Sequence, residues 1–270
     1  MNPLLNQFMK KYRYKIFTIF IALFLTTGQV YSQHPISSSS VLEVEKLSLE
    51  DVKSSGKLLI SQPLGFTKIV GDATDSLDVL VITVHGYKSE GYEWVEPITK
   101  LAGRYANTYF YRYEWEICPQ EAGDELARQI GPLVKSIPGI KRVVLFGHSY
   151  GGIVVTYFAS ELQIPLNVEI HTIAAPLAGY PRIFEQCGIE KSKDKKIIFP
   201  FWGSSVHHYQ WRTVHKQDNA FNKMPNDPQI VFLQGSQAKR LPETMDGRRL
   251  GHNWSITWVI DEYLGIQHIQ

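Results

Sequence analysis

This chain contains few cysteines and carries only a small net positive charge. Only Cys118 and Cys187 occur among its 270 residues, and the formal net charge is +2. Two cysteines exclude a framework of several disulfides and leave two possibilities open, one disulfide or two free thiols. The sequence also shows no internal repeat.

The first 32 residues have the parts of a secretory signal peptide. A basic start precedes the apolar stretch 16–25, and Val30-Tyr31-Ser32 suits cleavage before Gln33. A helix needs about 20 apolar residues to span a bilayer, and this stretch is shorter. An uncleaved membrane anchor is therefore the less favoured alternative. We expect residues 1–32 to be removed and the protein to be secreted or periplasmic.

Removal of this segment changes the charge balance. It takes away four of the 28 Lys and Arg residues and none of the 26 Asp and Glu residues, so the net charge moves from +2 to −2. A chain this close to neutral has no basic surface for nucleic acid, which excludes that class of partner. Removing 32 of 270 residues leaves 238, which suit one domain with a sizeable core.

A polar segment at 33–57, with four consecutive serines at 37–40, separates the signal peptide from the more apolar remainder. Such composition is typical of an extended arm. We therefore expect an arm at 33–57 and a single domain at 58–270.

Within 58–270, apolar runs alternate with amphipathic stretches. The run 79–84 is almost entirely apolar, as expected for a strand whose two faces are both covered by helices. The alternation predicts an α/β fold with a doubly wound, mainly parallel sheet, helices on both faces, and reactive groups at the carboxyl ends of the strands. We expect strands at 66–70, 79–84, 108–113, 143–146, 168–174, 210–214 and 229–233, and helices at 121–137, 150–162 and 254–264.

The most informative segment is Gly147-His148-Ser149-Tyr150-Gly151-Gly152, directly after the apolar run 143–146. A serine hydroxyl is a poor nucleophile at neutral pH unless a base takes its proton. A sharp strand-to-helix turn would hold Ser149 out toward such a base, and glycines on either side would prevent collision between strand and helix. The segment therefore predicts a nucleophile at Ser149.

This turn and its context resemble the nucleophile elbow of the α/β-hydrolase superfamily, in particular its lipase- and esterase-like serine hydrolases. The resemblance covers about residues 58–265 and implies the triad order Ser, acid, His. His252 stands before the last predicted helix, where the family places its base, and Asp218 follows the penultimate predicted strand. The resemblance thus implies a triad of Ser149, Asp218 and His252, in which Asp218 orients the imidazole that takes the serine proton.

Asp227 and Glu185 are the alternatives for the acid. Asp227 precedes a proline at the start of the last predicted strand, where a turn or cap role is simpler. Glu185 would require the acid to move to an earlier strand. The remaining histidines adjoin or precede Ser149, lie before the expected acid, or, like His268, stand too near the end of the chain.

The resemblance also implies an oxyanion hole made of backbone amides. One donor is the amide of Tyr150, directly after the nucleophile. The other is the amide of Tyr87, because His85-Gly86-Tyr87 resembles the His-Gly oxyanion turn of the family. Each amide aimed at the developing negative charge lowers the barrier by a few kcal/mol.

An insertion at about 177–207 stands where the superfamily carries its cap. Its lysine-rich segment 191–196 leads into the apolar run 197–202. This run could face a fatty chain or a lipid surface, or it could belong to a solvated loop and the core. A disulfide between the two cysteines would tether the insertion.

His207, His208, His215 and Asp218 are close in sequence, but their spacing matches no zinc-ligand pattern. Ser–His chemistry needs neither a metal nor a cofactor, so we expect the protein to contain neither. The sequence thus predicts an exported serine hydrolase of carboxylic esters that acts through an acyl-enzyme on Ser149. Its substrate would be a small-molecule or lipid ester, with transient lipid-surface contact through the cap and no obligate protein partner.

Other hypotheses stay open. An acyltransferase or a peptidase of the same fold would use the same residues. A hydrolase-fold binding protein without activity is the alternative from a different class.

Overall fold

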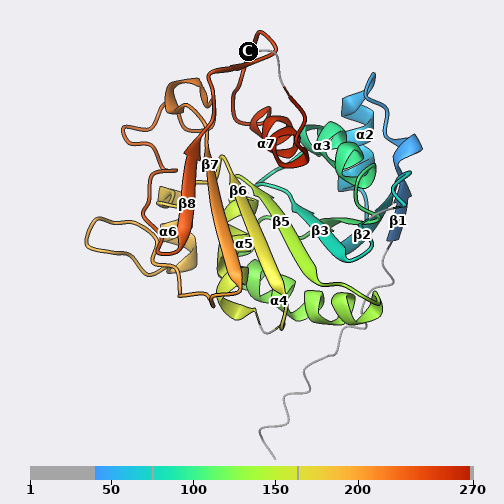
Figure 1. The fold of residues 1–270 in the computed structure, drawn as a ribbon. Coiled ribbons are helices and arrows are strands. Elements are labelled where there is room, and N and C mark those ends of the chain that lie inside the picture. Colours follow the sequence, from blue (N-terminus) through green and yellow to red (C-terminus); the bar gives the residue numbers. More distant parts are fainter. Residues whose placement is uncertain (1–39, 75, 163, 268–270) are drawn as a thin grey trace, which may run out of the picture. The chain divides into compact units, whose positions relative to one another are not determined.

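The computed structural model describes residues 40–74, 76–162 and 164–267 (Figure 1). The predicted signal peptide at 1–32 and the first part of the predicted arm, 33–39, lie outside the described residues. Both stay predictions.

Eight strands of the described chain form one sheet, in the order β1-β2-β4-β3-β5-β6-β7-β8. The first two strands run parallel to each other, β2 pairs antiparallel with β4, and every later pair is parallel. The strands are β1 (Ser40–Glu43), β2 (Gly65–Val70), β3 (Val79–Val84), β4 (Asn107–Arg112), β5 (Arg142–His148), β6 (Asn167–Ile173), β7 (Val206–Arg212) and β8 (Ser236–Arg240). A separate short hairpin joins β9 (Thr244–Met245) to β10 (Arg248–Arg249).

Helices cover both faces of the main sheet. Figure 1 shows α2 (Val52–Ile60), α3 (Tyr92–Ala102) and α7 (Ser255–Leu264) grouped together, and α4 (Pro119–Ser136) beside α5 (Tyr150–Glu161). The side chains of β3 alternate between two hydrophobic cores: 80, 82 and 84 pack with α4 and α5, and 79 and 81 with α2, α3 and α7. All six residues of β3 are buried, as its continuous apolar run predicts.

This architecture confirms the predicted fold class. The sheet is mainly parallel and doubly wound, β5 leads through a sharp turn into α5, and the loop after β3 lies beside that turn. The chain has the α/β-hydrolase fold.

The N-terminal boundary of the domain differs from the prediction. Instead of an extended arm up to residue 57, β1, the short 3₁₀ helix η1 (Val44–Lys46) and α2 belong to the packed fold. Leu42, Leu47 and Leu59 are buried in the core beneath α3 and α7. In β1 the burial alternates, and only Leu42 of its four residues is buried. Because a four-residue strand with one buried apolar side chain gives a weak sequence signal, this element was missed, and the domain extends at least to Ser40.

The predicted strand at 229–233 is wrong. Its side chains alternate between buried and exposed, with Phe232 88% exposed, which mimics a strand pattern. Its backbone carbonyls instead accept from side chains: the Arg212 guanidinium donates to the Val231 carbonyl, and the Lys196 ammonium group donates to the Ile230 carbonyl. The free edge of β7 pairs with β8. β7 itself begins four residues before the predicted 210.

The segment between β6 and β7 contains α6 (Pro181–Cys187) and a single bridge between Lys191 and Ile197. Cys187 at the end of α6 forms a disulfide with Cys118, the residue before α4, with 5.5 Å between the Cα atoms. The disulfide therefore ties this segment to the helix layer that also carries α5.

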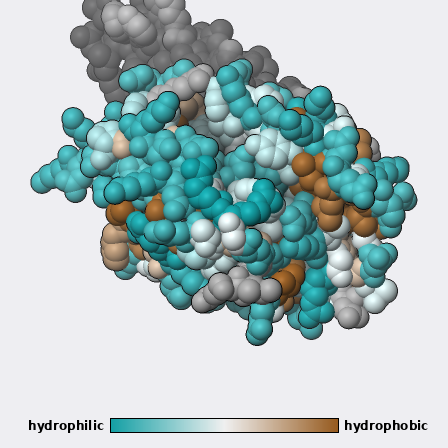
Figure 2. Space-filling model, turned by 90° about the horizontal axis from the view of Figure 1, so that it is seen from above, coloured by the Kyte–Doolittle hydropathy of each residue, from teal (hydrophilic) through white to brown (hydrophobic). Residues whose placement is uncertain are grey.

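Apolar side chains are exposed around the same segment. Phe201 is 82% exposed, and Ile198 and Ile230 are also exposed. The face shown in Figure 2 is mostly hydrophilic, with apolar side chains in small, separate patches. Among the described residues, no helix is long and apolar enough to cross a membrane. The predicted lipid-surface contact of the cap stays a prediction.

The disulfide yields a prediction about stability. It joins residues 69 positions apart, so its loss gives the unfolded chain more conformational freedom. The double variant Cys118→Ser/Cys187→Ser should have a free energy of unfolding about 2–4 kcal/mol lower than that of the wild type. Urea denaturation of both proteins measures this difference. An unchanged midpoint and slope would show that the crosslink does not stabilise the fold.

Candidate active site

The nucleophile elbow predicted from the sequence is a strained turn. Ser149 lies between β5 and α5 with φ +52° and ψ −120°, a conformation that costs a residue with a side chain about 1–3 kcal/mol. Its amide donates to the Ile173 carbonyl at 2.8 Å, and its carbonyl accepts from the Gly152 amide at 3.0 Å. These bonds on both sides hold the serine in place.

Glycine is required where this turn meets its neighbours. A Cβ at Gly147 would lie 2.5 Å from the Gly151 carbonyl oxygen, and a Cβ at Gly151 would lie 2.4 Å from the His85 carbonyl oxygen. Both distances are too short for carbon and oxygen. The glycines therefore allow the strand, the helix and the loop after β3 to approach one another closely.

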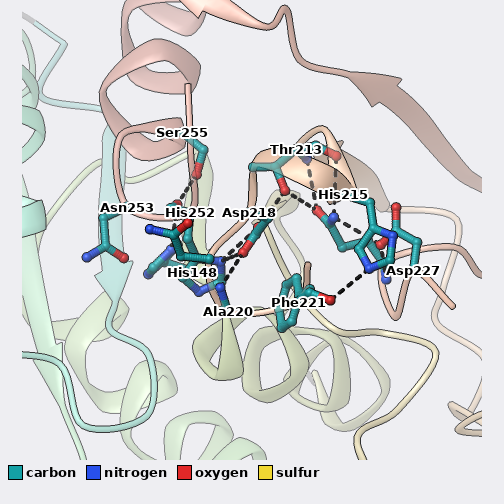
Figure 3. A network of polar contacts seen from close by, with 12 residues as sticks. His148, Thr213, His215, Asp218, Ala220, Phe221, Asp227, His252, Asn253 and Ser255 are labelled. Atoms are coloured by element: carbon teal, nitrogen blue, oxygen red, sulfur yellow. Dashed lines mark hydrogen bonds and ion pairs between the residues drawn. The ribbon is translucent and has the colours of Figure 1, made fainter. Parts of the chain in front are cut away.

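The structure brings Asp218 and His252 together, although 34 residues separate them (Figure 3). Asp218 follows the short helix η2 (His215–Gln217) after β7, and His252 precedes α7. The His252 Nδ1–H donates to the carboxylate of Asp218, with 2.9 Å between Nδ1 and Oδ2. In a neutral imidazole held in this way, Nε2 carries a lone pair and can accept a proton.

Asp218 is fully buried, and its carboxylate has three partners. Besides His252, Oδ2 accepts from the Thr213 hydroxyl at 2.5 Å and Oδ1 accepts from the Ala220 amide at 3.0 Å. The Gln229 side chain accepts from the Thr213 amide at 2.9 Å. This network compensates the loss of water around the carboxylate and fixes its orientation (Figure 3).

His252 is also held through its ring and its backbone. The ring packs edge-on against Phe221, with 4.9 Å between the centroids. The backbone carbonyl accepts from the Ser255 hydroxyl at 2.5 Å and from His148 Nε2 at 3.1 Å. Burial, together with the neighbouring His252, lowers the pKa of His148. His148 is therefore a neutral hydrogen-bond donor to the backbone of His252.

The two residues predicted for the oxyanion hole lie on neighbouring segments. Tyr87 follows β3, and Tyr150 is the first residue of α5; their rings meet edge to face with 6.3 Å between centroids. The Tyr150 hydroxyl donates to the Ile117 carbonyl at 2.7 Å, and this hydrogen bond fixes the position of the Tyr150 side chain. An amide in the first turn of a helix has no acceptor within that helix, so the Tyr150 N–H suits an oxyanion.

Two cavities meet at this site, and Tyr87, Ser149 and His252 line both. The smaller has a volume of about 150 Å³ and a polar wall that includes Ser89, Glu93, His148 and Asn253. The larger, of about 360 Å³, is lined mainly by apolar and aromatic residues, among them Trp115, Tyr150, Pro176, Ile183 and Phe221. Ser149 and His252 are thus open to the same space, as a reaction between them requires.

The alternative acids lie elsewhere. Asp227 Oδ1 accepts from the amide and the side chain of Gln229, both at 3.0 Å, so Asp227 supports the partner of Thr213 and does not contact His252. Glu185 is exposed on α6. Of the neighbouring histidines, His207 is exposed, His208 is buried against Ser236, and His215 donates to the Phe221 carbonyl. Within the described residues, no three His, Cys, Asp or Glu side chains are grouped to hold a metal ion.

Sequence analysis missed several residues of this site. Thr213 and Gln229 belong to no motif, and their roles appear only when β7 and the segment before β8 come together. Glu93 lies in α3, a helix that the sequence analysis did not predict. The acidic and aromatic residues directly after the Gly86 turn were the available signal for Glu93.

Comparison with known proteins gives structural matches only. No protein-family model and no curated protein matches the chain. Among solved structures, a putative thioesterase from Silicibacter is 15% identical with a TM-score of 0.48, covering 77% of this chain and 85% of its own. A Bacillus licheniformis lipase is 14% identical with a TM-score of 0.46, covering 75% and 95%. An esterase described as degrading N-acyl homoserine lactones is 12% identical with a TM-score of 0.46, covering 75% and 96%.

Asparagine variants should show whether Asp218 or Asp227 is the acid of the proposed triad. Asp218→Asn keeps the shape of the side chain but removes the charge that orients and stabilises the imidazolium, so kcat should fall by about 10³- to 10⁴-fold. Asp227→Asn, which keeps an oxygen for Gln229, should stay within about threefold of the wild type. Steady-state hydrolysis of p-nitrophenyl butyrate measures both, and the reverse result would move the acid to Asp227.

Thr213 should act by positioning Asp218. Thr213→Val removes the hydroxyl bond to the carboxylate and should lower kcat about tenfold, or ~1.4 kcal/mol in the barrier, with little change in KM. Thr213→Ser keeps the hydroxyl and serves as the matched control. The same assay measures both variants, and equal kcat values in Thr213→Val and Thr213→Ser would exclude a role for this hydroxyl.

Proposed function

We propose that this protein is a serine hydrolase that cleaves carboxylic esters through an acyl-enzyme on Ser149. The observation that carries the proposal is the buried Asp218–His252 pair, whose imidazole shares two cavities with a serine held in a strained turn. Strain of this kind persists where the surrounding structure enforces it, which is typical of active sites.

In the proposed reaction, His252 Nε2 takes the proton of the Ser149 hydroxyl while the oxygen attacks the ester carbonyl carbon. The negative charge that forms on the carbonyl oxygen is stabilised by the amides of Tyr87 and Tyr150. The imidazolium, stabilised by Asp218, then donates its proton to the leaving alcohol as the carbon–oxygen bond breaks. His252 Nε2 then takes a proton from a water molecule while the water oxygen attacks the acyl carbon. The imidazolium returns the proton to the Ser149 oxygen as its bond to the acyl carbon breaks, which releases the carboxylic acid and the free serine.

The cavities suggest how an ester would be bound. The apolar cavity, with Trp115, Ile183 and Phe221 in its wall, suits the acyl group because burial of apolar surface drives its binding. Its wall includes Cys187 and therefore touches the disulfide that tethers α6. The disulfide also supports export to an oxidising compartment, which we propose together with the predicted signal peptide.

An activity-based probe tests the nucleophile. A fluorophosphonate should label the wild type covalently and should not label Ser149→Ala, because only a serine activated by a base attacks the phosphorus at neutral pH. Ser160→Ala, which changes a partly buried serine on the same helix, is the control and should label normally. Intact-protein mass spectrometry measures the added mass.

The same proteins should be assayed with p-nitrophenyl butyrate. Hydrolysis by the wild type and its loss in Ser149→Ala would support the esterase. A folded wild type that neither reacts with the probe nor hydrolyses the ester would favour a binding protein without activity. Labelling without ester hydrolysis would favour a peptidase or an acyltransferase of the same fold.

A further inference from the structure

The small polar cavity contains a buried carboxyl group that the proposed chemistry does not use. Glu93, the second residue of α3, lines this cavity and is only 8% exposed. One of its oxygens, Oε1, accepts from the Ser89 hydroxyl. The other, Oε2, is buried with no hydrogen-bond partner among the described residues.

A second unpartnered atom belongs to His148, another residue in the wall of the same cavity. His148 is 3% exposed, and its Nε2 donates to the His252 carbonyl. Its Nδ1 is buried and has no partner in the described part of the chain. Because burial keeps this imidazole neutral, Nδ1 carries a lone pair. Oε2 of an ionised Glu93 and Nδ1 of His148 are therefore two acceptors that the described chain leaves unpaired, on residues that line one cavity.

From this arrangement we propose that the small cavity binds a protonated amine on the alcohol part of the ester, with Glu93 as its counter-charge. This inference rests on the proposed hydrolysis at Ser149. The apolar cavity is larger and suits the acyl group, which leaves the small cavity for the alcohol. Its volume of about 150 Å³ is less than half of the about 360 Å³ of the apolar cavity, which suits a short alcohol better than a long chain.

The charges around the cavity favour a cation. Glu90 and Glu93 both line it, and the one lysine in its wall, Lys88, holds its ammonium group 5.4 Å from the centre of the Tyr87 ring. Burial raises the pKa of Glu93, while the Ser89 hydroxyl and the neighbouring His252 oppose this rise. A bound cation would favour the ionised carboxylate and would give Oε2 the partner that the described chain does not supply.

Two butyrate esters of equal shape test this inference. The alcohol of one is 2-(dimethylamino)ethanol, whose amine is protonated at pH 7, and the alcohol of the other is 3-methylbutanol, in which carbon replaces nitrogen. After correction for the hydroxide-catalysed rates, the wild type should prefer the amine ester at least tenfold in kcat/KM, mainly through KM. Equal values for the two esters, in protein that hydrolyses p-nitrophenyl butyrate, would overturn the inference without touching the proposed function.

Variants on one helix locate the effect. Glu93→Gln should lower the preference for the amine ester at least tenfold, because the amide cannot balance the charge. Glu96→Gln makes the same change three residues later, outside the cavity, where the side chain pairs with Lys100, and it should keep the preference. A preference that survives in Glu93→Gln would also overturn the inference. The wild-type comparison does not depend on either variant folding. If the folded wild type neither hydrolyses any of the esters nor reacts with the fluorophosphonate, the proposed function is contradicted instead.

Discussion

The close approach of the β5–α5 turn to the end of β3 is the constraint on which the site depends. Backbone atoms meet there with no room for a side chain at Gly151. This contact holds Ser149 at positive φ, and it places the loop after β3, with Tyr87, beside the first turn of α5. The proposed nucleophile and the proposed oxyanion hole are therefore positioned by one packing contact in the centre of the sheet. Strain at Ser149 is sustained because neighbouring strands are buried on both faces.

Burial of Asp218 imposes the second constraint. A carboxylate removed from water needs several hydrogen bonds, and the chain supplies them from three directions: Thr213 at the end of β7, the amide of Ala220, and His252 before α7. Each partner fixes one direction of the carboxylate, and the imidazole is fixed in turn. The carbonyl of His252 is tied to His148, the residue before the nucleophile. Hydrogen bonds thus connect Asp218 and His252 to the end of β5, directly before Ser149, although these residues lie far apart in sequence.

The sequence predicted those parts of the molecule whose signals are local. The strand 79–84 was predicted to the residue because every position is buried, and Ser149 was identified because its turn has a strict glycine requirement. β8 was missed because four of its five residues are exposed at the sheet edge and its one apolar residue is an alanine, and a neighbouring apolar alternation at 229–233 competed with it. Asp218 and His252 were chosen by their order along the chain. Thr213 and Glu93 could not be chosen in this way, because their importance comes from neighbours that only the folded chain provides.

The division of the site into two cavities separates the proposed chemistry from the selection of substrate. Tyr87, Ser149 and His252 are common to both cavities, whereas Glu93 lines only the polar one and Ile183 only the apolar one. Changes in either outer wall can alter what is bound without moving the central residues. The fold and the elbow therefore constrain the reaction class more tightly than the substrate, since the residues that would select a substrate lie on α3 and α6, outside the motif. A buried carboxyl group with one unpartnered oxygen is informative for this reason: packing alone gives no cause to keep it in the same cavity wall as His252.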